Sequence, residues 1–221
     1  MRISAIAFAF CVGAVTLGAA CNEGAKSGST PEAAAPAGPA PDSFQVVFET
    51  SRGNFTVDVL RSWAPKGADR FYDLVQDKFF DGARFFRVVP GFVVQFGLNG
   101  EPKRNEQWDK RITDDSVTHS NLRGVLTFAT EGLNTRSHQL FINLADNPRL
   151  DRMGFSPIGR VVDGMSVVDS LNSEYGESPD QGMIQSLGNS YLERMFPRLD
   201  YIKTARVAGS AVGSGGNGGT P

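Results

Sequence analysis

The chain has 221 residues, of which 40% are hydrophobic and 21% are charged, with a formal net charge of −2. This balance fits one soluble globular domain rather than a disordered chain. It lacks the excess of basic residues that nucleic-acid binding requires, so we expect no nucleic-acid partner.

The first 20 residues have the pattern of a secretory signal peptide. An early arginine precedes an apolar run and a set of small residues, and the run is too short and too rich in alanine to favour a permanent membrane span. The stretch LGAAC, which ends at Cys21, is similar to a bacterial lipobox, although Gly18 stands where leucine is usual. We therefore predict that Cys21 is lipidated and that the protein is extracytoplasmic, anchored to a membrane of the cell envelope. Ordinary signal-peptidase cleavage is the alternative.

Composition predicts where the folded domain begins and ends. Residues 21–43 are rich in Ala, Pro, Gly and Ser, which is typical of a flexible tether, and residues 209–221 have the composition of a disordered tail. We therefore place the domain at residues 44–208. The only cysteines are Cys11 and Cys21, so we expect the domain to contain neither a disulfide nor a thiolate metal site.

The first half of the domain changes periodicity twice. Alternating apolar residues predict a β-hairpin over residues 44–60, with its turn at TSRG. After Pro65, the spacing of Ala68, Phe71, Tyr72 and Val75 predicts a helix with one buried stripe. Residues 84–97 return to a strand pattern.

The second half begins with a predicted long polar loop over residues 98–121. Short strands are predicted at 124–130, 139–144, 155–162 and 200–207, with short helices near Met165 and over residues 190–196. Many short strands and few helices favour a β-barrel or sandwich with helices at its ends over βαβ units.

Several kinds of catalytic chemistry have no candidate residues in this chain. The two histidines, His119 and His138, lie in polar surroundings and are predicted to be surface loop residues rather than catalytic ones. Nucleophile-elbow, zinc-protease and phosphate-loop motifs are absent. An enzyme built from this sequence is therefore expected to work without a covalent nucleophile, a metal or a cofactor.

Three polar residues interrupt apolar strands and require an explanation. Burying an unpaired charge is costly, yet Arg87 lies in the run ARFFRVVPGFVVQFG. Because strand residues two apart share a face, Gln95 accompanies Val93, and Gln139 accompanies Phe141. Each strand can thus present a hydrogen-bonding group beside an apolar one, as in a pocket for a small ligand or peptide. Taken singly, each glutamine is better explained by hydrogen bonds to backbone groups.

Three ordered sequence blocks resemble the cyclophilin family. FFRVVPGFVVQFG is similar to the signature F-H-R-V-I followed by F-M-x-Q-G-G, and GVLTFATEGLNTRSHQLFINL is similar to the block G-x-x-x-M-A-N-x-G-x-N-T-x-x-S-Q-F-F-I. LDRMGFSPIGRVVDGMSVVD resembles the third block, and residues 188–207 resemble the ending of a bacterial branch. The resemblance implies a mainly β fold: a closed eight-stranded antiparallel β-barrel capped by two main α-helices. We also expect a monomer.

The resemblance assigns roles to individual residues. It implies that Arg87 is the catalytic arginine and that Gln95 helps to hold it. The residues implied to bind substrate, through the proline pocket, the peptide backbone or a glutamine side chain, are Phe92, Val93, Ala129, Thr130, Gln139, Phe141 and Leu150.

The chain departs from the family pattern at five positions, and at one of them, near Gly154, the usual pocket histidine has no counterpart. Phe86 replaces the usual histidine, Val93 replaces methionine, and Phe96 stands where glycine is frequent. Arg149 aligns with a tryptophan of well-known eukaryotic members. These changes alter the surroundings of the implied site but keep its arginine and its apolar pocket.

The resemblance implies a peptidyl-prolyl cis-trans isomerase that acts on proline-containing segments of exported polypeptides. The alternative from another class is a proline-peptide binding or chaperone module with little catalysis. Arg87 favours the enzyme, because a module that only binds does not need a guanidinium at this position. A purely structural envelope barrel would explain the apolar surfaces but not the three ordered blocks.

Overall fold

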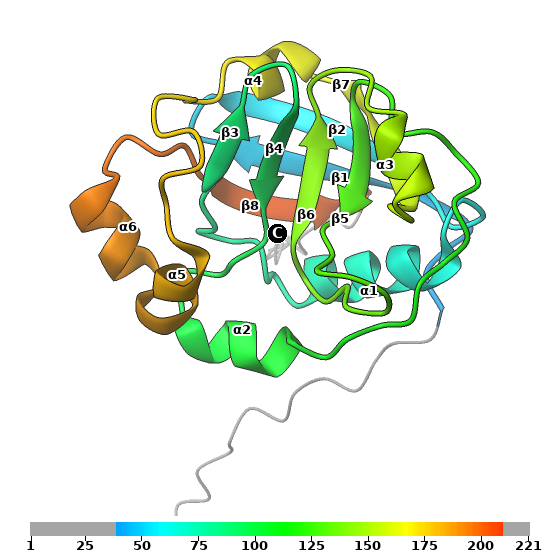
Figure 1. The fold of residues 1–221 in the computed structure, drawn as a ribbon, viewed down its shortest axis with the longest axis horizontal. Coiled ribbons are helices and arrows are strands. Elements are labelled where there is room, and N and C mark those ends of the chain that lie inside the picture. The colour runs from blue at the N-terminus through cyan, green and yellow to red at the C-terminus, as the bar shows by residue number, and fades with distance from the viewer. Residues whose placement is uncertain (1–38, 210–221) are drawn as a thin grey trace, which may run out of the picture. The chain divides into compact units, whose positions relative to one another are not determined.

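Eight antiparallel strands form one curled sheet in the computed structural model, which describes residues 39–209 (Figure 1). The order across the sheet is β3-β4-β6-β5-β7-β2-β1-β8. The strands are β1 Ser43–Thr50, β2 Gly53–Leu60, β3 Arg87–Val89, β4 Val93–Phe96, β5 Val125–Phe128, β6 Leu140–Asn143, β7 Pro157–Asp163 and β8 Ile202–Val207.

The sheet is an open, curled half-barrel, so the predicted closed barrel was wrong in this respect. Strands β3 and β8 form its two edges and do not pair with each other along their length. The segments before them meet at an isolated bridge between Arg84 and Tyr201. Strand β3 has only three residues and ends at Val89, just before Pro90, which leaves it too short to form a ladder with β8.

The predicted hairpin over residues 44–60 is confirmed as β1 and β2. Its alternating apolar residues point inward, and Phe48 stacks on Phe55 across the strands with the ring centroids 4.7 Å apart. The Thr50 hydroxyl donates to the Gly53 carbonyl at 2.7 Å and so closes the turn. Such cross-strand aromatic pairs fix the register of a hairpin.

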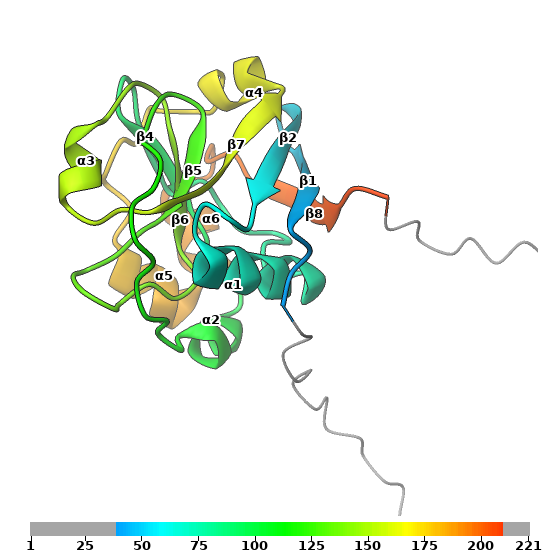
Figure 2. The same ribbon diagram turned by 90° about the vertical axis from the view of Figure 1, so that its right-hand side faces the viewer.

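Helices α1 (Pro65–Gln76) and α2 (Pro102–Trp108) lie at one end of the sheet, and α4 (Met165–Asp169) lies at the other (Figure 2). The predicted helix after Pro65 is confirmed as α1, although Tyr72 is only half-buried. The prediction of two main helices was wrong, because residues 39–209 form one helix of 12 residues and five shorter ones. The helices are α1 Pro65–Gln76, α2 Pro102–Trp108, α3 Arg149–Arg152, α4 Met165–Asp169, α5 Gln181–Leu187 and α6 Asn189–Met195.

Among residues 39–209, apolar side chains gather in three clusters. The largest fills the space between the sheet and α1 and includes Phe48, Phe71, Phe80 and Phe96. A second lies beneath α5 and α6, around Phe86 and Leu192. The third, described below, lines a pocket on the opposite face of β4 and β6. Within residues 39–209, no helix combines the length and apolar character that a membrane crossing needs.

Candidate active site

Four neighbouring strands present one row of side chains on the outer face of the sheet. The register places Arg87 opposite Gln95, Gln95 opposite Phe141, and Phe141 opposite Thr127. Directly opposed residues of antiparallel strands project to the same face. Residues from β3, β4, β6 and β5 that lie as far as 54 positions apart in the chain therefore meet on one surface.

An apolar floor lies along this row. Val93, Phe141 and Leu150 are buried together, with Phe92, Ala129 and Phe155 packed against them. The ring of Phe155 meets that of Phe141 edge-on, with the centroids 5.7 Å apart. The alternate residues of the same strands, such as Val94 and Ile142, belong to the main core. The predicted strand parity is therefore confirmed.

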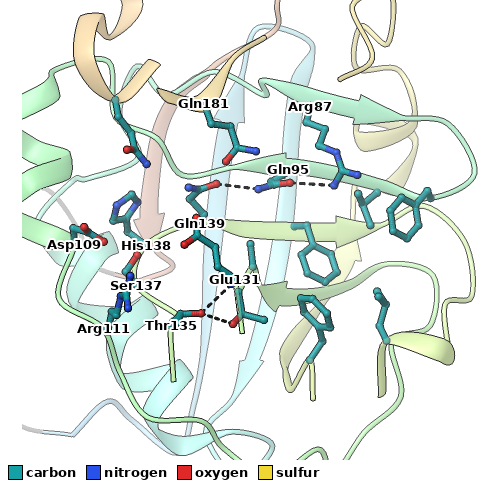
Figure 3. Close-up of a pocket in the computed structure, with 18 residues that line it drawn as sticks. Arg87, Gln95, Asp109, Arg111, Glu131, Thr135, Ser137, His138, Gln139 and Gln181 are labelled. Carbon is teal, nitrogen blue, oxygen red and sulfur yellow. Dashed lines mark hydrogen bonds between the residues drawn. The ribbon is translucent and has the colours of Figure 1, made fainter. Parts of the chain in front are cut away.

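Arg87 is held by polar partners within this apolar surface. Its Nη1 donates to Gln95 Oε1 at 3.2 Å, and Gln95 Nε2 donates to Gln139 Oε1 at 2.9 Å (Figure 3). On another edge, Nε donates to Glu177 Oε1 at 2.6 Å. The guanidinium carbon lies 5.5 Å from the centroid of the Phe92 ring. These contacts answer the question raised by the sequence, because the charge is neither unpaired nor fully removed from water.

All nine residues that were predicted to form the site line one cavity of about 420 Å³. The arginine and the two glutamines lie in a row, the apolar cluster lines another part of the cavity, and further polar residues line the rest. This juxtaposition suits a ligand with one apolar ring beside a hydrogen-bonding group. The nine are Arg87, Phe92, Val93, Gln95, Ala129, Thr130, Gln139, Phe141 and Leu150.

Hydrogen bonds within the protein already occupy some of the polar groups of residues 129–130. The Ala129 N–H donates to the Gln139 carbonyl at 2.9 Å. The Thr130 hydroxyl contacts that of Thr135 at 2.7 Å and also donates to the Gly132 carbonyl. A peptide bound along this segment would therefore have to use groups other than the Ala129 amide proton.

The sequence did not reveal every residue that lines the cavity. Phe155 was within reach of prediction, because it lies in the third sequence block beside Leu150. Four more lie in the second sequence block, in the turn before β6, and were likewise within reach. The rest come from the predicted polar loop and from α5, where the local sequence gives no sign that they approach the site. Besides Phe155, the lining residues that were missed are Asp109, Arg111, Glu131, Thr135, Ser137, His138, Gln181 and Gln185.

His138 is buried, so its predicted position on the surface was wrong. The residue is only 2% exposed, and Nδ1 lies 2.6 Å from the Gly97 carbonyl oxygen. A carbonyl only accepts hydrogen bonds, so Nδ1 carries the proton of the neutral ring. Burial lowers the pKa of His138, which keeps the ring neutral at pH 7. His119 is exposed as predicted and stacks on Trp63 with the ring centroids 4.0 Å apart.

A buried polar network supports the apolar floor from behind. The Asn121 amide donates to Asp151 at 2.8 Å and to the Phe155 carbonyl at 2.9 Å, while its oxygen accepts from Thr127 at 2.8 Å. Burial would raise the pKa of Asp151, but hydrogen bonds from Ser120 and Asn121 outweigh it and lower that pKa. Asp151 remains charged at neutral pH and fixes α3, which carries Leu150.

Comparisons with known proteins agree with the sequence blocks. The family model described as "Cyclophilin type peptidyl-prolyl cis-trans isomerase/CLD" matches residues 45–188. The peptidyl-prolyl cis-trans isomerase ppi1 of Schizosaccharomyces pombe is 34% identical over 142 residues, covering 62% of this chain and 90% of that protein. The peptidyl-prolyl cis-trans isomerase A of Dickeya dadantii is 34% identical over 151 residues, covering 65% and 78%.

Solved structures share the fold at lower identity. A cyclophilin-type isomerase of Cryptosporidium parvum superposes with a TM-score of 0.59 at 19% identity, covering 76% of this chain and 99% of that one. The same protein in the presence of the dipeptide Ala-Pro gives a TM-score of 0.56 at 20% identity, covering 74% and 98%. Cyclophilin AquaCyp293 of Hirschia baltica gives 0.59 at 16% identity, covering 79% and 77%.

Proposed function

The chain belongs to the cyclophilin-type peptidyl-prolyl cis-trans isomerases, and from that premise we propose that Arg87 drives its catalysis and that its substrates are exported polypeptides. The single observation that carries the catalytic proposal is the alignment of the Arg87 guanidinium, bonded to Gln95, with the apolar floor around Phe141 on one face of the sheet.

The barrier to X–Pro rotation comes from amide resonance and is about 18–20 kcal/mol. Uncatalysed exchange takes on the order of tens to hundreds of seconds. As the bond twists, resonance is lost and a lone pair develops on the prolyl nitrogen. A guanidinium that donates to this nitrogen binds the twisted form better than either planar form, and such differential binding lowers the barrier.

Each part of the cavity has a task in this mechanism. The proline ring docks on Val93, Phe141 and Leu150, which are buried and apolar. Gln95 accepts from Arg87 Nη1 and is itself held by Gln139, so one edge of the guanidinium is restrained before the reaction. No covalent bond of the substrate is broken, so the rotation needs neither a nucleophile nor a proton transfer.

Replacing Arg87 tests the catalytic proposal. Arg87→Ala should lower kcat/KM on an X–Pro peptide by at least about tenfold, which corresponds to about 1.4 kcal/mol of transition-state stabilisation. Arg123→Ala is the matched control, because Arg123 pairs with Asp169 on the surface and does not line the cavity. Unchanged turnover in a folded Arg87→Ala protein would refute the role of Arg87. Peptide binding without any turnover in the unmutated protein would favour the binding-module alternative.

We also propose an extracytoplasmic enzyme that is anchored through lipid on Cys21. The support is the sequence pattern of residues 1–21, and these residues lie outside the described part of the structure. Membrane-extracted protein should have an intact mass that corresponds to a chain starting at lipidated Cys21. A mature chain that starts elsewhere and carries no lipid mass would refute the anchor, with no consequence for the role of Arg87.

A further inference from the structure

A carboxylate outside the predicted site contacts the proposed catalytic guanidinium. Glu177 Oε1 accepts from Arg87 Nε at 2.6 Å and also forms an ion pair with Nη2. Glu177 lies between α4 and α5, 90 residues from Arg87 in the chain. Neither the family blocks nor the strand periodicity indicates this contact.

The backbone that carries Glu177 is attached to the strand that carries Arg87. The Gly176 carbonyl accepts from the Val88 N–H at 3.2 Å, beside Arg87 in β3. The preceding Tyr175 packs edge-on against Phe196, with the ring centroids 5.1 Å apart. The Glu177 side chain itself is 62% exposed. Burial therefore does not force the carboxylate onto Arg87, whereas the attached backbone keeps it within reach.

Glu177 and Gln95 hold different edges of the same guanidinium. Glu177 occupies the edge formed by Nε and Nη2, and Gln95 accepts from Nη1. A guanidinium has five N–H groups in a rigid planar fork, so two such contacts fix its plane while N–H groups on the Nη atoms remain available. An arginine held on one edge only would still rotate about its terminal side-chain bonds.

We propose that Glu177 is a positioning residue that orients Arg87 for the twisted prolyl bond, an inference that rests on the catalytic role proposed for Arg87. A nearby carboxylate can also act against catalysis, because its negative charge weakens the positive field of the arginine. Orientation dominates here, because Glu177 is largely in water, where its charge is screened, whereas the short hydrogen bond to Nε is directional.

Kinetics of Glu177 variants test this role. Glu177→Ala should lower kcat for an X–Pro peptide by about fivefold, or about 1 kcal/mol, which is the upper range for a partly exposed ion pair. KM should change by less than about twofold, because Glu177 is not among the residues that line the apolar floor. Glu177→Gln keeps an oxygen that accepts from Nε and should retain at least about half of the activity.

Glu174→Ala is the matched control, because Glu174 lies on the same segment but pairs with Arg198. It should leave kcat unchanged, and all three variants should keep the thermal unfolding midpoint of the unmutated protein. Equal losses in Glu174→Ala and Glu177→Ala would show that the segment matters only structurally. An unchanged or raised kcat in Glu177→Ala, or a Glu177→Gln protein as impaired as Glu177→Ala, would also overturn the proposal.

The double variant separates this inference from the function on which it rests. In an Arg87→Ala background, Glu177→Ala should cause no further loss, because the group that it positions is gone. If Arg87→Ala lowers the rate but the Glu177 variants do not, only the inference fails. If Arg87→Ala itself has no effect, the catalytic role of Arg87 fails and the role of Glu177 falls with it.

Discussion

Phe141 contributes both to the stability of the domain and to the proposed docking of proline. It is buried in the apolar floor, lies opposite both Gln95 and Thr127, and contacts the Phe155 ring edge-on. Phe141→Ala should destabilise the domain by about 3–5 kcal/mol and raise KM for an X–Pro peptide. Phe141→Leu, which keeps an apolar side chain of similar bulk, should cost less than about 1.5 kcal/mol. Urea unfolding and steady-state kinetics measure both effects. A Phe141→Ala protein with normal stability and normal KM would remove Phe141 from the floor of the site.

The buried ring of His138 makes stability depend on pH. Burial lowers the pKa of His138 in the folded chain, while the unfolded chain keeps a value near about 6.5. Between these two values the unfolded chain binds more protons, so the free energy of unfolding falls as the pH drops below about 6.5. His138→Gln should remove this dependence above the range where carboxylates titrate, about pH 4.3.

The other histidine supplies the control for this measurement. His119 is exposed, so a His119→Gln protein should keep the same fall in stability below about pH 6.5. Urea unfolding at several pH values gives the slope for each protein. A slope that survives in His138→Gln would assign the pH dependence to other groups.

At the scale of elements, α1 receives its N-terminal cap from a distant loop. Ala64, which precedes the helix, makes no side-chain capping bond. Instead the Asp115 carboxylate accepts from the Lys66 and Gly67 N–H groups at 3.2 and 2.9 Å, and it also accepts from Arg136 at 3.0 Å. A carboxylate at a helix N-terminus is favourable, and here it also balances a guanidinium that is only 2% exposed.

Removing the Asp115 carboxylate should therefore lower the free energy of unfolding far more than removing a surface carboxylate. Asp115→Ala leaves Arg136 buried with Asp114 as its remaining acidic partner at 3.2 Å, and it should lower the free energy of unfolding by about 3–5 kcal/mol. Asp169→Ala breaks an exposed pair with Arg123 and should cost less than about 1 kcal/mol. Urea unfolding compares the two variants. Equal costs would mean that Asp115 serves as an ordinary surface residue.

The elements that the sequence revealed are those with an apolar period. Strand β4 alternates Val94 and Phe96 inward with Val93 and Gln95 outward, and α1 has a buried stripe, so both were predictable. Helix α2 was missed because only Asn105 of its residues is buried, which leaves no apolar stripe to detect. Asn105 is held by side-chain bonds to the Asn99 backbone at 2.7 and 3.0 Å, and a polar contact of this kind has no periodicity.

The residues of the candidate site also fall into two groups, those that the sequence predicted and those that it missed. Residues that sit in strands beside apolar neighbours, such as Arg87, Gln95 and Phe141, were found through strand parity and the family blocks. Glu177 and His138 were missed, because their surroundings are set by chain segments 90 and 41 residues away. The open edge between β3 and β8 was missed for the same reason, since a repeat of short strands does not say whether the last strand pairs with the third.

At the scale of the whole molecule, residues 40–42, which come just before β1, make hydrogen bonds to the folded domain. The Ala40 N–H donates to Asp69 Oδ1 at 2.9 Å, and the Asp42 carbonyl accepts from the Arg61 N–H at 2.9 Å. Asp69 also binds the Arg61 guanidinium at 2.7 and 3.0 Å. Residues 40–42 thus complete a polar cluster that joins the end of β2 to α1, on residues that do not line the cavity.

Two truncated chains test how much of the protein the fold requires. A chain of residues 39–209 contains all three apolar clusters and the whole cavity, so it should match the mature protein in thermal unfolding midpoint and kcat/KM. A chain of residues 44–209 loses the bonds from Ala40 and Asp42 and should be less stable by about 1–3 kcal/mol, because one of the lost bonds is made to a charged acceptor. Its kcat/KM at 25 °C should still match, because its site is complete. If the two chains unfold at the same temperature, residues 40–42 add nothing to the fold. If the longer one is already unstable, the outer segments contribute to stability through contacts beyond the described residues.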